Sequence, residues 1–343
     1  MFYNIEALSF FQKIKEGLNG KIVKGINSNY KDKDIQIRYS NKSFQTTFED
    51  HRKPGKPTIT TGKYFKSVII MLNRKLFYIL DGLFIDSHSP TVIQGSVNAI
   101  RNKGFTDLHK AYLKMVVPVK SNFVFRWTIE ESNFSSDRVA VSRRGTKLNL
   151  YGEEIFIIIE SDVDKNQYLI IESKKKQTFN AFNSKTHIIR IALGYLTGYY
   201  AGNEGCYFSY RDKKMEKMKG FKFQILRKEM KGLTQPVYAN PFGWIKNKKI
   251  ADKYYKQGML QPISIDSFSC LCQKLHASEE LLSSLLIILE SSAASLILRP
   301  GGYAIALETL SDVIIGGKEE RFAPITNKNE AGKFRKELSD KIG

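Results

Sequence analysis

Apolar and polar residues alternate from about residue 33 to residue 175, and this period of two restricts the fold more than any other feature of the chain. The segment IQIRY at residues 35–39 shows the alternation, and residues 123–129 show it again. Such alternation is typical of half-buried strands, because successive side chains point to opposite faces of a sheet. Turn residues such as Asp81-Gly82 separate the runs. The sequence therefore predicts a β-rich antiparallel sandwich or barrel-like domain over residues 1–176.

The period changes after the last of these strands. The segments EIFIIIESD and YLIIESKKK, joined by a short polar stretch, predict a hairpin over residues 155–174. Residues 178–200 then place apolar side chains three, four or seven positions apart, which is typical of a helix packed on one side. We expect residues 177–263 to form this helix and a basic, loop-rich region that packs on the β-rich domain.

A helical segment is predicted over residues 264–343, so that the fold class of the whole chain is α+β. Ser278 is a suitable N-cap for a helix that carries two glutamates in its first turn. Arg299-Pro300-Gly301-Gly302 is expected to end that helix and to form a turn before a second one. Two such helices leave apolar faces that another part of the chain, a second copy or further residues would have to cover.

The whole chain has a net charge of +20, and its basic residues are concentrated in one part of the sequence. Residues 1–260 carry 45 Lys and Arg against 23 Asp and Glu, whereas residues 261–343 carry 9 against 11. This field favours an anionic partner such as a nucleic acid, although the same charge also serves solubility alone. Since no secretory signal or membrane-spanning segment is visible, we expect a cytoplasmic protein that does not engage a membrane.

The hairpin contains the one candidate catalytic site, formed by Asp162, Asp164, Glu172 and Lys174. In nucleases of the PD-(D/E)xK type, two acidic residues on neighbouring strands hold Mg²⁺ while a lysine acts on the attacked phosphate or the water. Alternation places Glu172 and Lys174 on one strand face, as this chemistry requires. The alternative interpretation is that these four residues are simply the solvated end of a hairpin. No further cofactor is expected, because the histidines are scattered and no phosphate-binding glycine motif occurs.

Basic clusters mixed with aromatic residues provide candidate nucleic-acid contacts. Lysine and arginine neutralise phosphates while aromatic rings stack on bases, which suits single-stranded nucleic acid. The alternative is a solvated lysine-rich face beside ordinary core aromatics. The candidate residues are Arg143, Arg144, Lys174, Lys175, Lys176, Arg211, Lys213 and Lys214.

Several segments together resemble the bacterial ApeA-like proteins of the HEPN superfamily. They are YLIIES at the end of the strands, the helix ending in ALGYLTG, NPFGW at residues 240–244 and YAIALETL at residues 303–310. The resemblance implies a β-rich N-terminal part, a helical HEPN domain and a role in antiphage defence in which a HEPN dimer cuts RNA.

HEPN nucleases use an Arg followed by a His after four to six residues, and this chain lacks that pair. The resemblance then implies either a non-catalytic relative or a catalytic helix beyond Gly343, and the ending KFRKELSDKIG is like a helix cut in mid-course.

Three functional readings follow from the sequence. The leading one is the nucleic-acid-binding or sensing portion of a HEPN-type defence protein without its own catalytic motif. Its partner would be nucleic acid, with RNA favoured over DNA, or a phage-derived trigger, and its C-terminal helices would allow a homodimer. The alternatives are a Mg²⁺-dependent nuclease that uses the hairpin and a non-catalytic protein-interaction module.

Overall fold

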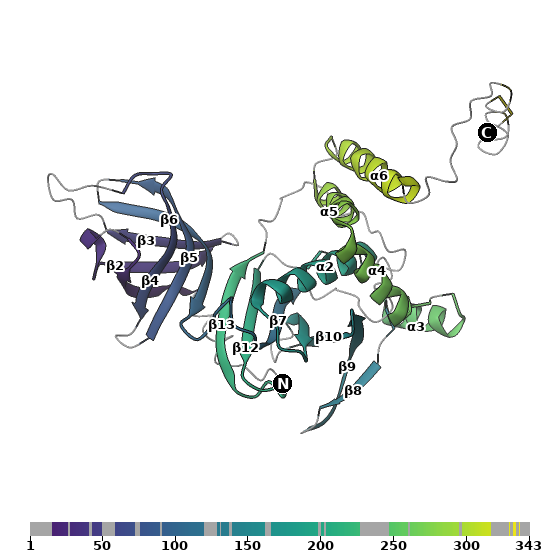
Figure 1. Ribbon diagram of the computed structural model, residues 1–343, viewed down its shortest axis with the longest axis horizontal. Coiled ribbons are helices and arrows are strands. Elements are labelled where there is room, and N and C mark those ends of the chain that lie inside the picture. The colour runs from purple at the N-terminus through teal and green to yellow at the C-terminus, as the bar shows by residue number, and fades with distance from the viewer. Residues whose placement is uncertain are drawn as a thin grey trace.

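The computed structural model describes residues 16–26, 28–40, 43–49, 59–72, 76–89, 91–119, 129–130, 132–136, 139–161, 166–197, 200–201, 204–226, 247–259, 261–294 and 297–316, with four further positions between 329 and 336. The architecture is α+β, as the sequence predicts: a β-barrel continues into an open sheet, and helices cover one face of that sheet (Figure 1). No helix among the described residues has both the length and the apolar character needed to cross a membrane.

Six antiparallel strands form the barrel, which is closed by pairing between the third and the sixth strand. Their inward residues are mostly Ile, Val, Leu and Phe, so that the alternation in the sequence becomes an inside and an outside surface. The strands are β1 (Leu18–Lys24), β2 (Asp34–Ser40), β3 (Ser43–Glu49), β4 (Tyr64–Leu72), β5 (Leu76–His88) and β6 (Val92–Asn102). A 3₁₀ turn, Ser28–Tyr30, precedes β2.

Seven further antiparallel strands form the open sheet, in the order β13-β12-β7-β11-β10-β9-β8. Strand β13 also pairs with β6, with Phe223 opposite Ile100, so that the barrel and the open sheet are hydrogen-bonded to each other. The strands are β7 (Tyr112–Val119), β8 (Ser132–Ser136), β9 (Val139–Leu150), β10 (Glu153–Ser161), β11 (Gln167–Ser173), β12 (Glu204–Tyr210) and β13 (Met218–Ile225).

Five described helices complete the structure. Helix α2 contacts β7, α4 and α5, while α4 also packs on β9. Helix α6 packs on α5 and leaves Ile305 and Leu307 more than half exposed. The helices are α2 (Phe179–Thr197), α3 (Lys248–Lys256), α4 (Ile265–Ala277), α5 (Glu279–Ala293) and α6 (Arg299–Gly316).

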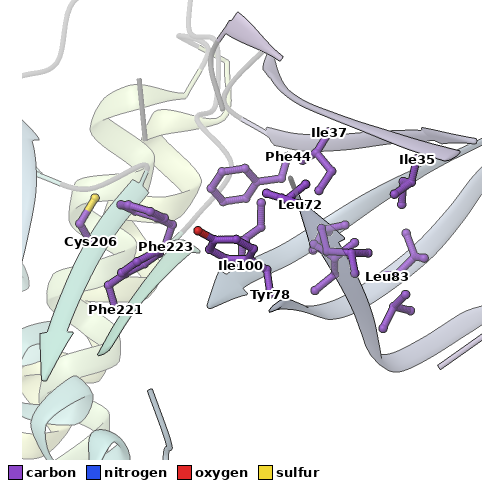
Figure 2. Packing of buried hydrophobic residues seen from close by; sticks show 14 of the residues in the cluster. Ile35, Ile37, Phe44, Leu72, Tyr78, Leu83, Ile100, Cys206, Phe221 and Phe223 are labelled. Carbon is purple, nitrogen blue, oxygen red and sulfur yellow. The ribbon is translucent and has the colours of Figure 1, made fainter. Parts of the chain in front are cut away.

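Two hydrophobic cores lie on opposite faces of the open sheet. The first fills the barrel and continues across Tyr78 and Ile100 to Phe221, Phe223 and Cys206 of the β12–β13 hairpin (Figure 2). The second lies between the open sheet and helices α2, α4 and α5. Because burial of one large apolar side chain contributes about 1.5–3 kcal/mol, residues on both faces of this hairpin stabilise the join between barrel and sheet.

The local predictions for the hairpin and its helix are confirmed. Strands β10 and β11 form the predicted antiparallel hairpin, with Ser161 opposite Gln167. Helix α2 occupies the segment whose apolar spacing predicted a helix. Ser278 is the N-cap of α5, where its side chain accepts a hydrogen bond from the Leu281 N–H.

The prediction that Pro300-Gly301-Gly302 forms an interhelical turn is wrong. All three residues lie in the first turn of α6, where proline is tolerated because its missing N–H would have no intrahelical acceptor. Gly302 meets Ser291 of α5 so closely that a Cβ would lie 1.8 Å from the Ser291 Oγ. The glycine therefore serves the contact between α5 and α6.

A polar side of α2 faces strand β12. The Tyr207 hydroxyl donates a hydrogen bond to the Asn183 Oδ1 at 2.5 Å, and burial raises the pKa of Tyr207 to about 12. One turn further along α2, burial and the neighbouring Arg190 charge lower the pKa of His187 to about 4. The native protein therefore holds this imidazole in its neutral form.

We expect Gly220→Ala to destabilise the protein by about 1–3 kcal/mol, because the added Cβ would overpack a backbone contact. A Cβ on Gly220 would lie 2.3 Å from the Phe105 N and 2.5 Å from the Gly104 C, where the segment after β6 crosses β13. Urea unfolding measures the loss. Gly301→Ala is the control, since nothing lies within 4 Å of its Cβ. Equal stability of the two variants would contradict the close contact.

We expect the stability to fall as the pH is lowered from about 6.5 to about 4. The folded His187 has a pKa of about 4 against 6.5 ordinarily, so that acid protonates this histidine in the unfolded chain first. The stabilising effect of the neutral imidazole is complete above pH 6.5 and decreases toward the folded pKa. Calorimetry measures the Tm of His187→Gln, which should depend less on pH over this range than the Tm of the control His109→Gln, a variant at an exposed histidine. Equal pH dependence of the two variants would contradict the lowered pKa of His187.

Candidate nucleic-acid interface

One edge of the open sheet brings together two basic clusters that are 35 residues apart in the sequence. Strand β11 ends at Ser173, β7 begins at Tyr112 and β12 ends at Tyr210. These strands are consecutive neighbours, with Glu172 opposite Lys114 and Tyr210 opposite Tyr112. Since adjacent strands lie about 4.8 Å apart, the two clusters leave the sheet about 10 Å from each other. We call Lys174, Lys175, Lys176, Arg211, Lys213 and Lys214 the cationic edge.

The turn that carries Lys174, Lys175 and Lys176 is fixed at both of its ends. The Ser173 Oγ accepts a hydrogen bond from the Lys175 N–H and donates one to the buried Glu153 carboxylate at 2.6 Å. After the turn, Gln177 exchanges two backbone hydrogen bonds with Ala111, each of 3.0 Å. The lysines therefore project from an ordered backbone.

Glu153 also connects helix α2 to the turn that carries Lys174, Lys175 and Lys176. This carboxylate accepts a hydrogen bond from the Gln177 Nε2 at 2.7 Å and forms an ion pair with Lys185 of α2. Lys185 also donates to the Gln177 Oε1. The buried acid thus has three donors and joins β10, the basic turn and the helix.

The loop that carries Arg211, Lys213 and Lys214 is organised by one carboxylate. Asp212 accepts hydrogen bonds from the backbone N–H groups of Glu216 and Lys217, at 3.1 and 2.9 Å, and these bonds lower its pKa. Met215 is buried beneath the loop and adopts a positive φ of 56°. This arrangement closes the β12–β13 hairpin and leaves the three basic side chains exposed.

Behind the edge, lysines lie over aromatic rings and around a buried acid. Lys176 lies 5.5 Å from the Tyr112 ring centroid, and Lys114 lies at the same distance from that of Tyr210. The Glu172 carboxylate is 2.8 Å from the Lys114 Nζ and 3.3 Å from the Lys174 Nζ. Lys174 thus has a carboxylate partner, whereas in the described part of the chain the other five side chains of the cationic edge form no ion pair with a carboxylate.

The structure describes two of the four residues that the sequence predicted for a metal-dependent site. Glu172 and Lys174 lie in contact, and Lys174 follows the last residue of β11. Asp162 and Asp164 lie outside the described residues.

The described part of the predicted donor set, Glu172 with Lys174, does not by itself form a Mg²⁺ site. Two lysines already neutralise the Glu172 carboxylate, and the described residues contain no group of three or more His, Cys, Asp or Glu side chains that could hold a metal ion. A hard divalent cation requires several oxygen ligands that are not engaged with cations.

Arg143 and Arg144 belong to a different part of the sheet. They lie on β9, two strands across from β11, where they pair with Phe134 and Asn133 of β8. The register places them further from the cationic edge than Lys147, which is level with Phe156 and Glu172. They are therefore not part of that edge.

Sequence reasoning missed three residues that organise the edge: Lys114, Glu153 and Asp212. Lys114 lies in the apolar run AYLKMVVPV, where a single charge in a buried strand is itself a signal of a paired ion. Glu153 gives no comparable signal, because an acid at a strand start is usually solvated. The role of Asp212 follows from the geometry of the loop.

Comparisons of the chain with protein-family models, with curated proteins and with solved structures find no match. The resemblance to ApeA-like HEPN proteins therefore stays a prediction.

We expect Glu172→Gln to destabilise the protein by about 3 kcal/mol, because it leaves two lysines beside a neutral amide in a buried site. Urea unfolding tests this value. Glu154→Gln on β10 is the control: its pair with Lys147 is about half exposed, and exposed pairs contribute about 0–1 kcal/mol. A loss for Glu172→Gln as small as that of the control would show that the carboxylate is not the required counter-charge.

Proposed function

We propose that this chain binds nucleic acid through the cationic edge, with single-stranded RNA favoured over DNA. The observation that carries the proposal is the convergence of two separate basic clusters on one sheet edge. Side chains without a carboxylate partner retain their full charge for phosphates, and displacement of counterions from a polyanion then favours binding.

The fixed conformation of the two basic segments also supports the proposal. A basic tail loses conformational entropy on binding, whereas the turn at Lys174–Lys176 and the loop closed by Asp212 are fixed before binding. Lys176 and Tyr112 also bring a cation and an aromatic ring to the same edge. Such pairs suit unpaired bases next to a phosphate backbone.

The proposed biological setting comes from the resemblance alone. In an ApeA-like HEPN protein, a basic β-rich part of this kind would sense RNA or a phage-derived trigger, and the α5–α6 pair would belong to the helical domain. We propose this setting as the context of nucleic-acid binding.

Substitution of Lys213 and Lys214 by glutamine should weaken RNA binding by several-fold and reduce its salt dependence. Each phosphate contact contributes about −0.7 to the slope of log K against log salt for single strands, so that the loss of two contacts should reduce the slope by about 1.4. Fluorescence anisotropy with a labelled single-stranded RNA, over a series of salt concentrations, measures both quantities.

The control is Lys253→Gln with Lys256→Gln, which removes the same charge from exposed positions of α3, away from the β12–β13 hairpin (Figure 1). Equal weakening in the two double variants would mean that net charge alone attracts RNA. Absence of RNA binding at low salt would contradict the proposal and favour the protein-interaction reading. Preference for DNA over RNA would correct the ligand class.

A further inference from the structure

Arg190 is a buried cation without an ion-pair partner among the residues that the structure describes. Its side chain lies on α2 with only 3% of the residue exposed. The Nη1 donates to the Ala201 carbonyl oxygen at 3.3 Å, and the guanidinium lies 5.5 Å from the Tyr200 ring centroid. The Nε has no hydrogen-bond partner, and among the described residues no carboxylate forms an ion pair with this arginine. The Nε–H is thus a buried donor without a partner, and one described hydrogen bond is made by the guanidinium.

Two other buried cations of the described residues have carboxylate partners. Lys114 has Glu172 at 2.8 Å, and Lys222, which is 7% exposed, has both Asp107 carboxylate oxygens at 3.3 Å. An unpaired buried charge is costly, because neither water nor a carboxylate replaces its lost hydration. Arg190 lacks the compensation that Lys114 and Lys222 have, and a missing anion would explain this difference.

The surroundings of Arg190 suit an anion that enters from solvent. His187 lies one helical turn earlier on the same side of α2 and is only partly buried. Tyr200 packs against the helix at Gly194, where an added Cβ would lie 3.2 Å from the Tyr200 Cα. Tyr200 thereby covers the guanidinium on one side, and the partly buried His187 lies beside it on the helix.

We propose that Arg190 and His187 form a binding site for a small oxyanion, a phosphate or a carboxylate group. The planar guanidinium presents parallel N–H donors that match two oxygens of such a group. The imidazole supplies a further donor beside them. The site lies near Ala201, before β12 begins, whereas the cationic edge lies where β12 ends at Tyr210. It is therefore independent of the proposed nucleic-acid interface.

Isothermal titration calorimetry of the full chain tests the site with inorganic phosphate, acetate and a nucleoside 5′-monophosphate, in chloride buffers of equal ionic strength. We expect saturable binding of at least one of these anions at one site per chain, and the strongest of the three identifies the ligand class. Arg190→Met should weaken that binding by about tenfold or more, because charge-assisted hydrogen bonds are lost. The same variant should still bind RNA.

Lys222→Met is the matched control, since it removes a buried cation that already has a carboxylate, and it should keep the anion affinity of the native chain. If Arg190→Met does not fold, Arg190→Lys replaces it: the charge stays but the planar fork is lost, and we expect binding about tenfold weaker. The proposal is overturned if none of the three anions binds more tightly than chloride. Native affinity in the folded arginine variant would also overturn it.

Discussion

Strand β6 is the element on which the rest of the structure depends. Its first half pairs with β3 and closes the barrel, while its last residues pair with β13 and begin the open sheet. On its other side, β6 pairs with β5 along nearly its whole length. Since the hydrogen bonds of one strand serve both sheets, the barrel and the helix-covered sheet cannot separate without leaving backbone groups of β6 unpaired. Close backbone packing of Gly104 and Gly220 at the same point strengthens this join.

The join also decides where charge can be placed. Both faces of the β12–β13 hairpin carry buried residues, so that ionisable side chains there must be paired or must emerge at the strand ends. Lys222 is a paired side chain, with Asp107 as its partner. Arg211, Lys213 and Lys214 instead emerge beyond the strand end, in the loop after Tyr210. The cationic edge is thus a consequence of a sheet covered on both sides.

Local features of this fold were visible in the sequence, and its closure was not. Alternation predicted strands between residues 33 and 175, and the change of period predicted α2, because both depend on residues a few positions apart. Strands β12 and β13 lie in the segment that was expected to be rich in loops. Pairing of β3 with β6 and of β6 with β13 joins segments that are far apart in the chain. Strands β3 and β6 alternate like other strands of the barrel, whereas β13 is buried on both faces. Local pattern alone therefore cannot choose among the possible partners.

The candidate site also has features that the sequence predicted and features that only the structure shows. Composition identified the lysine clusters, but only the strand register shows that Lys174–Lys176 and Arg211–Lys214 share an edge and that Arg143 does not. Pairing likewise distinguishes residues of equal charge. Lys174 is neutralised in part by Glu172, and Lys213 is exposed.

Exposed and buried cations of this chain differ in what they can recognise. An exposed lysine attracts any polyanion, and salt screens its field. The guanidinium of Arg190 is shielded from salt and held by Ala201 and Tyr200, so that its unused donors have a fixed direction. A fixed donor pair selects a ligand by geometry, and this selectivity is retained at ionic strengths that dissociate a surface complex. The net charge of +20 counts Arg190 together with the exposed lysines, so it does not distinguish these two kinds of cation.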